Sequence, residues 1–287
     1  MNKIPNLHGM TRNGFRTLDR RLPLAQLIAS FGLLGGIASG QPAIDVNSPR
    51  PLAGTLARIQ EITGTAINYE EVAYENEEDL QKTTAATHPG LKPRIIPRGG
   101  QLTIPISISG PSRDVNAYAM VQQTLASYAI AKLPGSYRIA QKSDGIEVIP
   151  TEIAAAKGGL WTITPVLGRA VTFPYAERPA IETLQLILDS AAKAAAVPIK
   201  LLTVPWNGSE RVSFSATGQP ARDEITNLLA KVGGGPLSYQ LLYDPNDGTY
   251  YFNLIPVTRP LPQSTEAIPP ASPRPSSQNN PFFVKTK

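Results

Sequence analysis

The sequence predicts an α+β protein made of two repeated small units, each a small mixed sheet with two helices packed on it, followed by a disordered Pro-rich tail. Three observations support this prediction. The stretch RPLAGTLARIQEITG (50–64) returns as RPAIETLQLILDSAA (178–192). The tetrad P-[SA]-R-D opens a second helical pattern after each of them. Both copies then end in a hairpin pattern that contains Asp-Gly and closes on Ile-Pro.

The first helix of each copy follows Arg-Pro, where Pro is tolerated because the first turn of a helix has no intrahelical partner for its missing N–H. Apolar residues recur in both copies at i, i+4 and i+7, which is the period of one helix face. They are Leu52, Leu56 and Ile59 in the first copy, and Ala180, Leu184 and Ile187 in the second.

Four further patterns recur in the same order: a short strand before the first helix, two β-prone runs separated by a Gly-containing turn, a second helix, and a terminal hairpin. We expect them at 43–46, 94–110, 111–129 and 135–150 in the first copy, and at 171–173, 199–218, 220–233 and 237–257 in the second.

Acidic residues mark two kinds of position in this pattern. Asp114 and Asp223 fall in the first turn of the second helices, where the helix dipole favours negative charge. The hairpin turns carry Asp144-Gly145 and Asp247-Gly248, a pair that suits a positive φ.

The spacing of the copies defines the domains. The first helices lie 128 residues apart but the Arg-Asp pairs only 109, so the first copy holds about 19 extra residues. We assign them to an insert at 69–93, expected as an exposed loop or a short helix with a loop. The units are then 41–150 and 171–258. In the linker 151–170, residues 160–166 are expected to form a strand that docks the units, with Trp161 buried.

The first forty residues read as an export signal. Lys3 and four Arg precede an apolar run at 22–37, and Ala38-Ser39-Gly40 predicts cleavage before Gln41. The alternative is an uncleaved anchor, although about 16 apolar residues are short for a spanning helix. Cleavage would leave no integral membrane span and places the protein in the periplasm or outside the cell. With no Cys in the chain, apolar cores rather than disulfides must stabilise it.

The positive charge lies at the two ends of the chain. The net charge is +5, while 1–40 carries five basic residues and one acid, and 259–287 carries four and one, so that 41–258 has a net charge of −2. A body of this charge has no bulk attraction for phosphates, and no nucleic-acid partner is expected. The tail 259–287 contains seven Pro and too few apolar residues to offset the entropy of ordering it.

Residues suited to catalysis or metal binding are scarce. His88 is the one histidine after the signal, and its THPG context favours a solvated loop. Zinc would need more His or Cys. The acidic run YEEVAYENEED (69–79) favours a solvated face, since it lacks the order of a calcium-binding EF-hand. We therefore expect no catalytic residue, cofactor or metal. A carboxylate pair for glycoside hydrolysis is the alternative, which only the separation of the two groups can test.

Aromatic residues of the second copy are the candidates for partner binding. Trp206 lies beside the Asn207-Gly208 turn, and Tyr243, Tyr250 and Phe252 belong to the last hairpin. Aromatic side chains left exposed in a cluster typically mark a protein interface.

The order of elements resembles the STN domain, the small N-terminal module of secretins and TonB-dependent transducers. The residues that match are Pro51, Leu52, Leu56, Ile59, Thr63 and Gly64 in the first copy, and Ala221, Ile225, Leu228, Leu229, Tyr239, Leu241, Tyr250, Phe252 and Leu254 in the second. The resemblance implies an envelope setting and action by protein–protein contact, with no catalytic residue to carry over. The pore and transport barrels that follow in those families have no counterpart in this sequence.

Three functional hypotheses follow. The first is a non-enzymatic, exported envelope protein that serves as a protein-interaction or assembly module, accessory to secretion, pilus or outer-membrane signalling machinery, and that binds a partner at an exposed sheet edge. The second is a periplasmic ligand-binding, or carbohydrate-binding or hydrolysing, protein with its site between the repeats. The third is a purely structural duplicate. The sequence leaves the partner, the pathway and the oligomeric state open.

Overall fold

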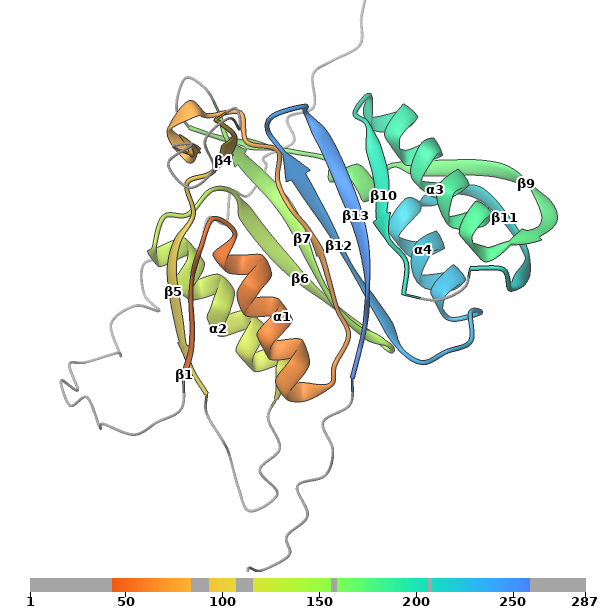
Figure 1. Ribbon diagram of the computed structural model, residues 1–287, viewed down its shortest axis with the longest axis horizontal. Coiled ribbons are helices and arrows are strands. Elements are labelled where there is room, and N and C mark those ends of the chain that lie inside the picture. The colour runs from red at the N-terminus through yellow and green to blue at the C-terminus, as the bar shows by residue number, and fades with distance from the viewer. Residues whose placement is uncertain (1–42, 84–92, 107–115, 156–158, 206–207, 259–287) are drawn as a thin grey trace, which may run out of the picture. The chain divides into compact units, whose positions relative to one another are not determined.

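The protein is described here by a computed structural model (Figure 1). The structure describes residues 43–83, 93–106, 116–155, 159–205 and 208–258. The predicted export signal, the Pro-rich tail, His88, Asp114 and Trp206 lie outside these ranges. Within them, no helix is both long and apolar enough to cross a membrane.

The fold is a mixture of helices and strands, as the sequence predicts. The first half consists of β1 (Ala43–Ser48), α1 (Pro51–Thr63), β2 (Ile67–Glu70), the 3-10 helix η2 (Glu77–Asp79), β3 (Leu80–Lys82), β4 (Ile95–Pro97), β5 (Gly100–Pro105), α2 (Ala117–Ile130), β6 (Ser136–Lys142) and β7 (Gly145–Ala154). The second half consists of β8 (Leu160–Thr162), the 3-10 helix η4 (Val166–Gly168), β9 (Ala170–Pro179), α3 (Ala180–Ala195), β10 (Ile199–Thr203), β11 (Arg211–Pro220), α4 (Ala221–Leu229), β12 (Leu237–Asp244) and β13 (Thr249–Pro256).

Strand pairing follows the same scheme in both halves. The strand before the first helix pairs antiparallel with the strand before the second helix, β1 with β5 and β9 with β11. The last strand of each half lies between two neighbours, one parallel and one antiparallel: β7 lies between β2 and β6, and β13 lies between β10 and β12. The extra strands β3 and β4 pair with each other and with no other described strand.

The three-stranded sheets of the two halves are joined. Strand β12 pairs parallel with β2, with Gln240 opposite Tyr69 and Leu241 opposite Glu70, which gives the order β10-β13-β12-β2-β7-β6. Strand β8 pairs with β7 beside this path. The sequence predicted one small sheet for each unit. The structure instead makes both part of one sheet, and we call the β2–β12 contact the seam.

Each half nevertheless keeps its own apolar core, and the two cores lie on opposite faces of the shared sheet. Leu241 belongs to the core under α3 and α4. The next residue, Leu242, packs against the core under α1 and α2, which also contains Tyr69. Because successive strand residues point to opposite faces, the helices of the two halves cover opposite sides of the sheet (Figure 1).

The pairs of β-prone runs after the first helices do not form hairpins. Strand β4 pairs with β3 and β5 with β1, while β10 lies in the large sheet and β11 pairs with β9. Gly99, between β4 and β5, has φ +61°, and a Cβ there would lie 2.1 Å from the carbonyl oxygen of Ser48. Glycine is needed here because two chain segments cross so closely that a side chain at this position would collide with the backbone of Ser48.

The expected linker and insert both differ from the sequence prediction. Strand β7 continues to Ala154, and β8 and η4 follow it, with Leu167 fully buried in the second core. The prediction of a buried Trp161 is wrong: the residue is 62% exposed, because β8 is a short strand whose three residues all face solvent. The insert begins with the last two residues of β2, and 71–76 and η2 then form the predicted loop and short helix; the strand β3 that follows was not predicted.

Glycine is needed at the two Asp-Gly turns for different physical reasons. Gly248 has φ +67°, as predicted for this turn. Gly145 has no positive φ but begins β7, where a Cβ would lie 2.4 Å from the backbone oxygen of Ala66. Glycine is needed at this second position because two backbones approach closely. Asp223 does lie in the first turn of α4.

Candidate functional site

Buried charge at the seam begins with Glu71, which immediately follows β2. Its side chain is 1% exposed and accepts hydrogen bonds from Arg50 Nε at 3.1 Å, the Tyr74 hydroxyl at 2.7 Å and the backbone N–H of Tyr243 at 2.8 Å. Arg50 also donates to the backbone carbonyl of Tyr243. This ion pair therefore bonds both backbone groups of Tyr243, as a neighbouring strand would, and extends the seam beyond the end of β2.

Glu70 forms a second buried ion pair on the opposite face of the sheet. Its carboxylate accepts hydrogen bonds from Arg222 Nη2 at 2.6 Å and from the backbone N–H of Leu167 at 3.2 Å. Side-chain exposure is 3% for Glu70 and 8% for Arg222. Arg222 comes from α4 and Leu167 from η4, so this carboxylate fixes two elements of the second half onto a strand of the first.

Burial dominates the titration of both seam carboxylates. Loss of water raises the pKa of Glu70 and of Glu71 above 4.5, and the nearby Arg222 and Arg50 offset part of that rise. Each carboxylate also receives hydrogen bonds, so neither is left as a free acid or base in a cleft. The sequence prediction of a solvated acidic face is wrong for these two residues, because they pair with arginines inside the fold.

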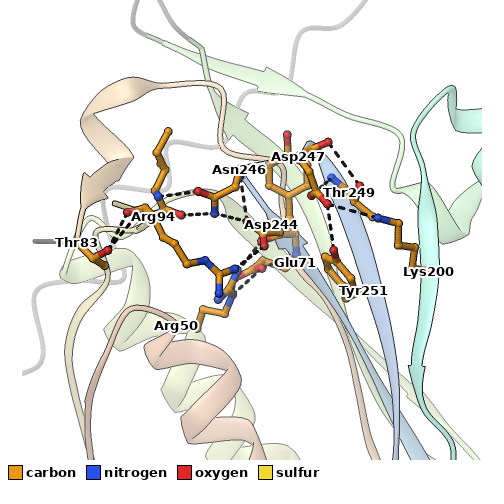
Figure 2. Close-up of polar contacts among 12 residues, drawn as sticks. Arg50, Glu71, Thr83, Arg94, Lys200, Asp244, Asn246, Asp247, Thr249 and Tyr251 are labelled. Carbon is orange, nitrogen blue, oxygen red and sulfur yellow. Dashed lines mark hydrogen bonds and ion pairs between the residues drawn. The ribbon is translucent and has the colours of Figure 1, made fainter. Parts of the chain in front are cut away.

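Figure 2 shows a second contact between the halves, at the β12–β13 turn. Asn246 donates to the carbonyl of Ile95 at 2.7 Å and accepts from its N–H at 2.8 Å. Arg94 donates to Asp244 at 2.9 Å. The pKa of Asp244 is lowered, because hydrogen bonds from Asn246 and the charge of Arg94 outweigh partial burial. Strand β4 of the insert region is thereby fixed to the second half.

The same turn orients a side chain of β10. Lys200 Nζ lies 3.5 Å from Asp247 Oδ2 and 5.5 Å from the ring centre of Tyr251, which itself donates to Asp247 at 3.0 Å (Figure 2). These contacts hold the lysine against β13 and the turn. Its charge is thus directed away from the outer side of β10.

Strand β10 ends the sheet on the side of the second half, and no described strand pairs with its outer side. Tyr250 N donates to Pro198 O, and Ile199 lies opposite Tyr250 in the parallel register. Since backbone groups alternate between the two sides of a strand, the N–H and C=O groups of Ile199 and Leu201 face outward. Leu202, at 64% exposed, stands beside them.

Strand β6 ends the sheet on the other side and differs in chemistry. It carries the exposed Arg138, Gln141 and Lys142. Charged side chains on an edge disfavour pairing with another strand. Of the two end strands in the order β10-β13-β12-β2-β7-β6, β10 is therefore the better fitted to accept a strand.

The aromatic residues predicted to bind a partner lie mostly in the interior. Phe252 is fully buried and stacks on Tyr239 with ring centres 5.2 Å apart, and Tyr250 is 4% exposed. Tyr243 is half-buried, with its ring centre 5.0 Å from that of Tyr250. These residues do not form an exposed patch, because the period of β13 turns Tyr250 and Phe252 toward α3 and α4. Trp206 lies outside the described residues.

Neither metal-binding side chains nor known proteins indicate a function for these residues. No group of three or more His, Cys, Asp or Glu side chains within the described ranges is placed to hold a metal ion. Comparisons of the chain with protein-family models, curated proteins and solved structures found no match.

Sequence reasoning missed Glu70, Glu71, Arg50 and Arg222 as partners across the two halves. Charged residues are rarely fully buried without a partner, so an acidic run is normally assigned to solvent. One signal was present: the two glutamates directly continue an apolar strand pattern at 66–69.

Proposed function

We propose that this protein is a non-enzymatic interaction module of the bacterial cell envelope, built from two STN-like units, that binds a partner protein by adding the partner's strand to β10. The observation that carries the proposal is the open edge of β10, with the outward backbone groups of Ile199 and Leu201 beside the exposed Leu202. Main-chain hydrogen bonds give affinity in such complexes, and alternate side chains give specificity.

The seam supports this mode of binding, because it is itself a parallel strand pairing between edges of the two halves. In the shared pairing scheme, β10 occupies in the second half the position that β2 occupies in the first. Strand β2 is covered by β12, whereas β10 has no described neighbour on its outer side. The second half therefore has, at one end of the sheet, an unpaired strand edge that corresponds to the β2 edge paired at the seam.

The polar groups of the seam support a structural role over a reaction centre. Glu70 and Glu71 each accept several hydrogen bonds inside the fold, and their arginine partners are engaged with them. A general acid or base needs a position from which it can reach a substrate proton. Export to the envelope is proposed from residues 1–40 alone.

Site-specific photo-crosslinking in the protein's native cells tests the proposal. A photoreactive residue in place of Leu202 should yield an adduct with a partner protein. The same residue in place of Ile130, which is 82% exposed at the end of α2, should yield none. Equal adducts at both positions, or none at 202, would contradict strand addition at β10.

A matched pair of variants tests whether backbone hydrogen bonds are involved. Leu201→Pro removes an N–H that faces outward, while Leu201→Ala loses packing but keeps that N–H. We expect the adduct formed from position 202 to disappear with Leu201→Pro and to persist with Leu201→Ala. Loss of the adduct in both variants would indicate a side-chain contact instead.

A further inference from the structure

A cavity of about 400 Å³ lies where the second half meets the uncovered face of the first half's sheet. Its floor is formed by β6 and β7, and its walls by residues 162–168 and the start of α4. The charged residues that line it are Arg138, Lys142, Glu147, Arg222 and Asp223. The volume falls within the roughly 300–1,000 Å³ range of small-molecule sites.

Glu147 is the buried acid of this cavity. The residue is 3% exposed, and its Oε1 has no hydrogen-bond partner among the described residues. Loss of water raises its pKa, and the charges of Arg222 and Lys142 only partly offset the rise. A buried carboxylate oxygen without a donor is unfavourable, and a ligand that brings a donor would remove the penalty.

Arg222 contributes the complementary group. Its Nη2 is bonded to Glu70, but its Nε is buried and has no acceptor among the described residues. The residue is 6% exposed and lines the same cavity. The cavity is thus lined by two nearly fully buried side chains of opposite charge, each with one polar atom that has no partner among the described residues. Lys142 and Asp223 are paired with each other at 3.3 Å and so neutralise each other at one side.

We propose that this cavity binds a small zwitterion, an amino acid or a dipeptide, whose ammonium group donates to the Glu147 carboxylate and whose carboxylate accepts from the Arg222 guanidinium, with Arg138 supplying further positive charge. The proposal is independent of strand addition at β10, which lies at the opposite end of the sheet order. One carboxylate and one guanidinium, each with a polar atom that has no partner among the described residues, match the two charged ends of such a ligand.

Other ligand classes fit the cavity less well. A metal ion would need more acidic ligands than Glu147 and Asp223, and a single phosphate would meet the carboxylate of Glu147. A sugar would normally stack on an aromatic ring, and none of the described residues that line the cavity is aromatic. A hydrolytic carboxylate pair is also disfavoured, because Asp223 is engaged with Lys142.

Isothermal titration of the full chain with the twenty amino acids and glycylglycine tests the proposal, each positive ligand being compared with its N-acetyl and C-amide analogues. We expect at least one free amino acid or glycylglycine to bind, and both blocked analogues to bind much more weakly. Failure of all these probes to bind, or unchanged binding of the blocked forms, would overturn the proposal.

Two variants locate the site. Glu147→Gln should weaken binding about tenfold to a hundredfold, the usual worth of a charge-assisted hydrogen bond. Asp144→Asn removes the same charge from an exposed turn residue outside the cavity lining, and we expect it to leave binding unchanged. Because Glu147→Gln removes a buried charge, we expect it to fold. Equal affinity of this variant and the native chain would refute the assignment of Glu147.

Discussion

The buried ion pair between Arg222 and Glu70 gives the sharpest prediction about how the two halves are held together. Arg222→Met removes the guanidinium but keeps much of the apolar volume. Glu70 would then stay buried without its charged partner, keeping the hydrogen bond from the Leu167 N–H. Breaking a buried pair on one side typically costs about 3–5 kcal/mol, because the remaining charge is uncompensated. We expect the free energy of unfolding at pH 7 to fall by roughly that amount.

Two further variants isolate the pairwise contribution. Glu70→Gln with Arg222→Met removes both charges, and we expect it to recover most of the loss, to within about 1–2 kcal/mol of the native chain. Arg211→Met serves as the surface control: Arg211 pairs with Glu177 at 2.9 Å, but both side chains are more than half exposed. Exposed pairs contribute about 0–1 kcal/mol, so this variant should be close to native.

The pH dependence of the Arg222→Met variant follows from the sign of the shift. The pKa of Glu70 is already raised by burial, and loss of Arg222 removes the largest group that lowers it. A carboxylate whose pKa is higher in the folded than in the unfolded state destabilises the fold at neutral pH. This penalty is relieved as the pH falls through the raised pKa toward 4.5. The deficit of the variant should therefore shrink between pH 7 and pH 5.

Urea denaturation followed by far-ultraviolet circular dichroism at both pH values measures these differences. A loss of less than about 1 kcal/mol in Arg222→Met, or a double variant that is no more stable than Arg222→Met, would refute the reasoning that this pair is buried and coupled.

Three other predictions concern single sites. Glu147→Gln should raise the unfolding free energy at pH 7 by about 1 kcal/mol, and the gain should vanish toward pH 4.5 as native Glu147 protonates; equal stability curves across this range would contradict it. Gly145→Ala should cost about 1–3 kcal/mol in urea unfolding because its Cβ would meet the Ala66 backbone, whereas Gly168→Ala, whose nearest neighbour is 3.5 Å away, should be nearly neutral; similar losses in both would disprove the close approach. Asn246→Ala should speed amide exchange of Ile95 at least tenfold, while leaving that of Leu241 unchanged. Unaltered exchange at Ile95 would show that the two hydrogen bonds between Asn246 and Ile95 do not form.

Much of the secondary structure could be predicted from local patterns. The helix after Arg50-Pro51 begins at Pro51, and the second terminal hairpin lies within its predicted range, while the first runs four residues past its predicted end because β7 continues to Ala154. These elements are set by period, by Pro at a helix start and by turn chemistry, all of which act over a few residues.

The seam could not be predicted, because strand partners across 171 residues leave no local pattern. Gln240 and Tyr69 are opposite each other only because β12 and β2 are both edges of their own halves. Nor does a sequence show that Glu70 and Glu71 are buried, since the arginines that compensate them come from elsewhere in the chain. The prediction that Trp161 is buried was wrong for a related reason: an aromatic residue in a short edge strand can be left outside both cores.

The cavity is likewise a product of the seam. Glu147 and Arg222 lie 75 positions apart in the printed sequence, in different halves. They line one space only because the joined sheet brings the start of α4 over β6 and β7. A sequence pattern could mark each as a charged residue, but not as two residues that line one cavity.

Nuclear Overhauser contacts between backbone protons of Tyr69–Glu71 and Gln240–Leu242 test most directly whether the two halves share one sheet. The parallel register predicts these cross-strand contacts with strengths like those within the other parallel pairs, β2–β7 and β10–β13. Intact hairpin contacts with none between β2 and β12 would show that the halves fold as separate sheets, and the seam, the buried ion pairs and the cavity would all have to be abandoned.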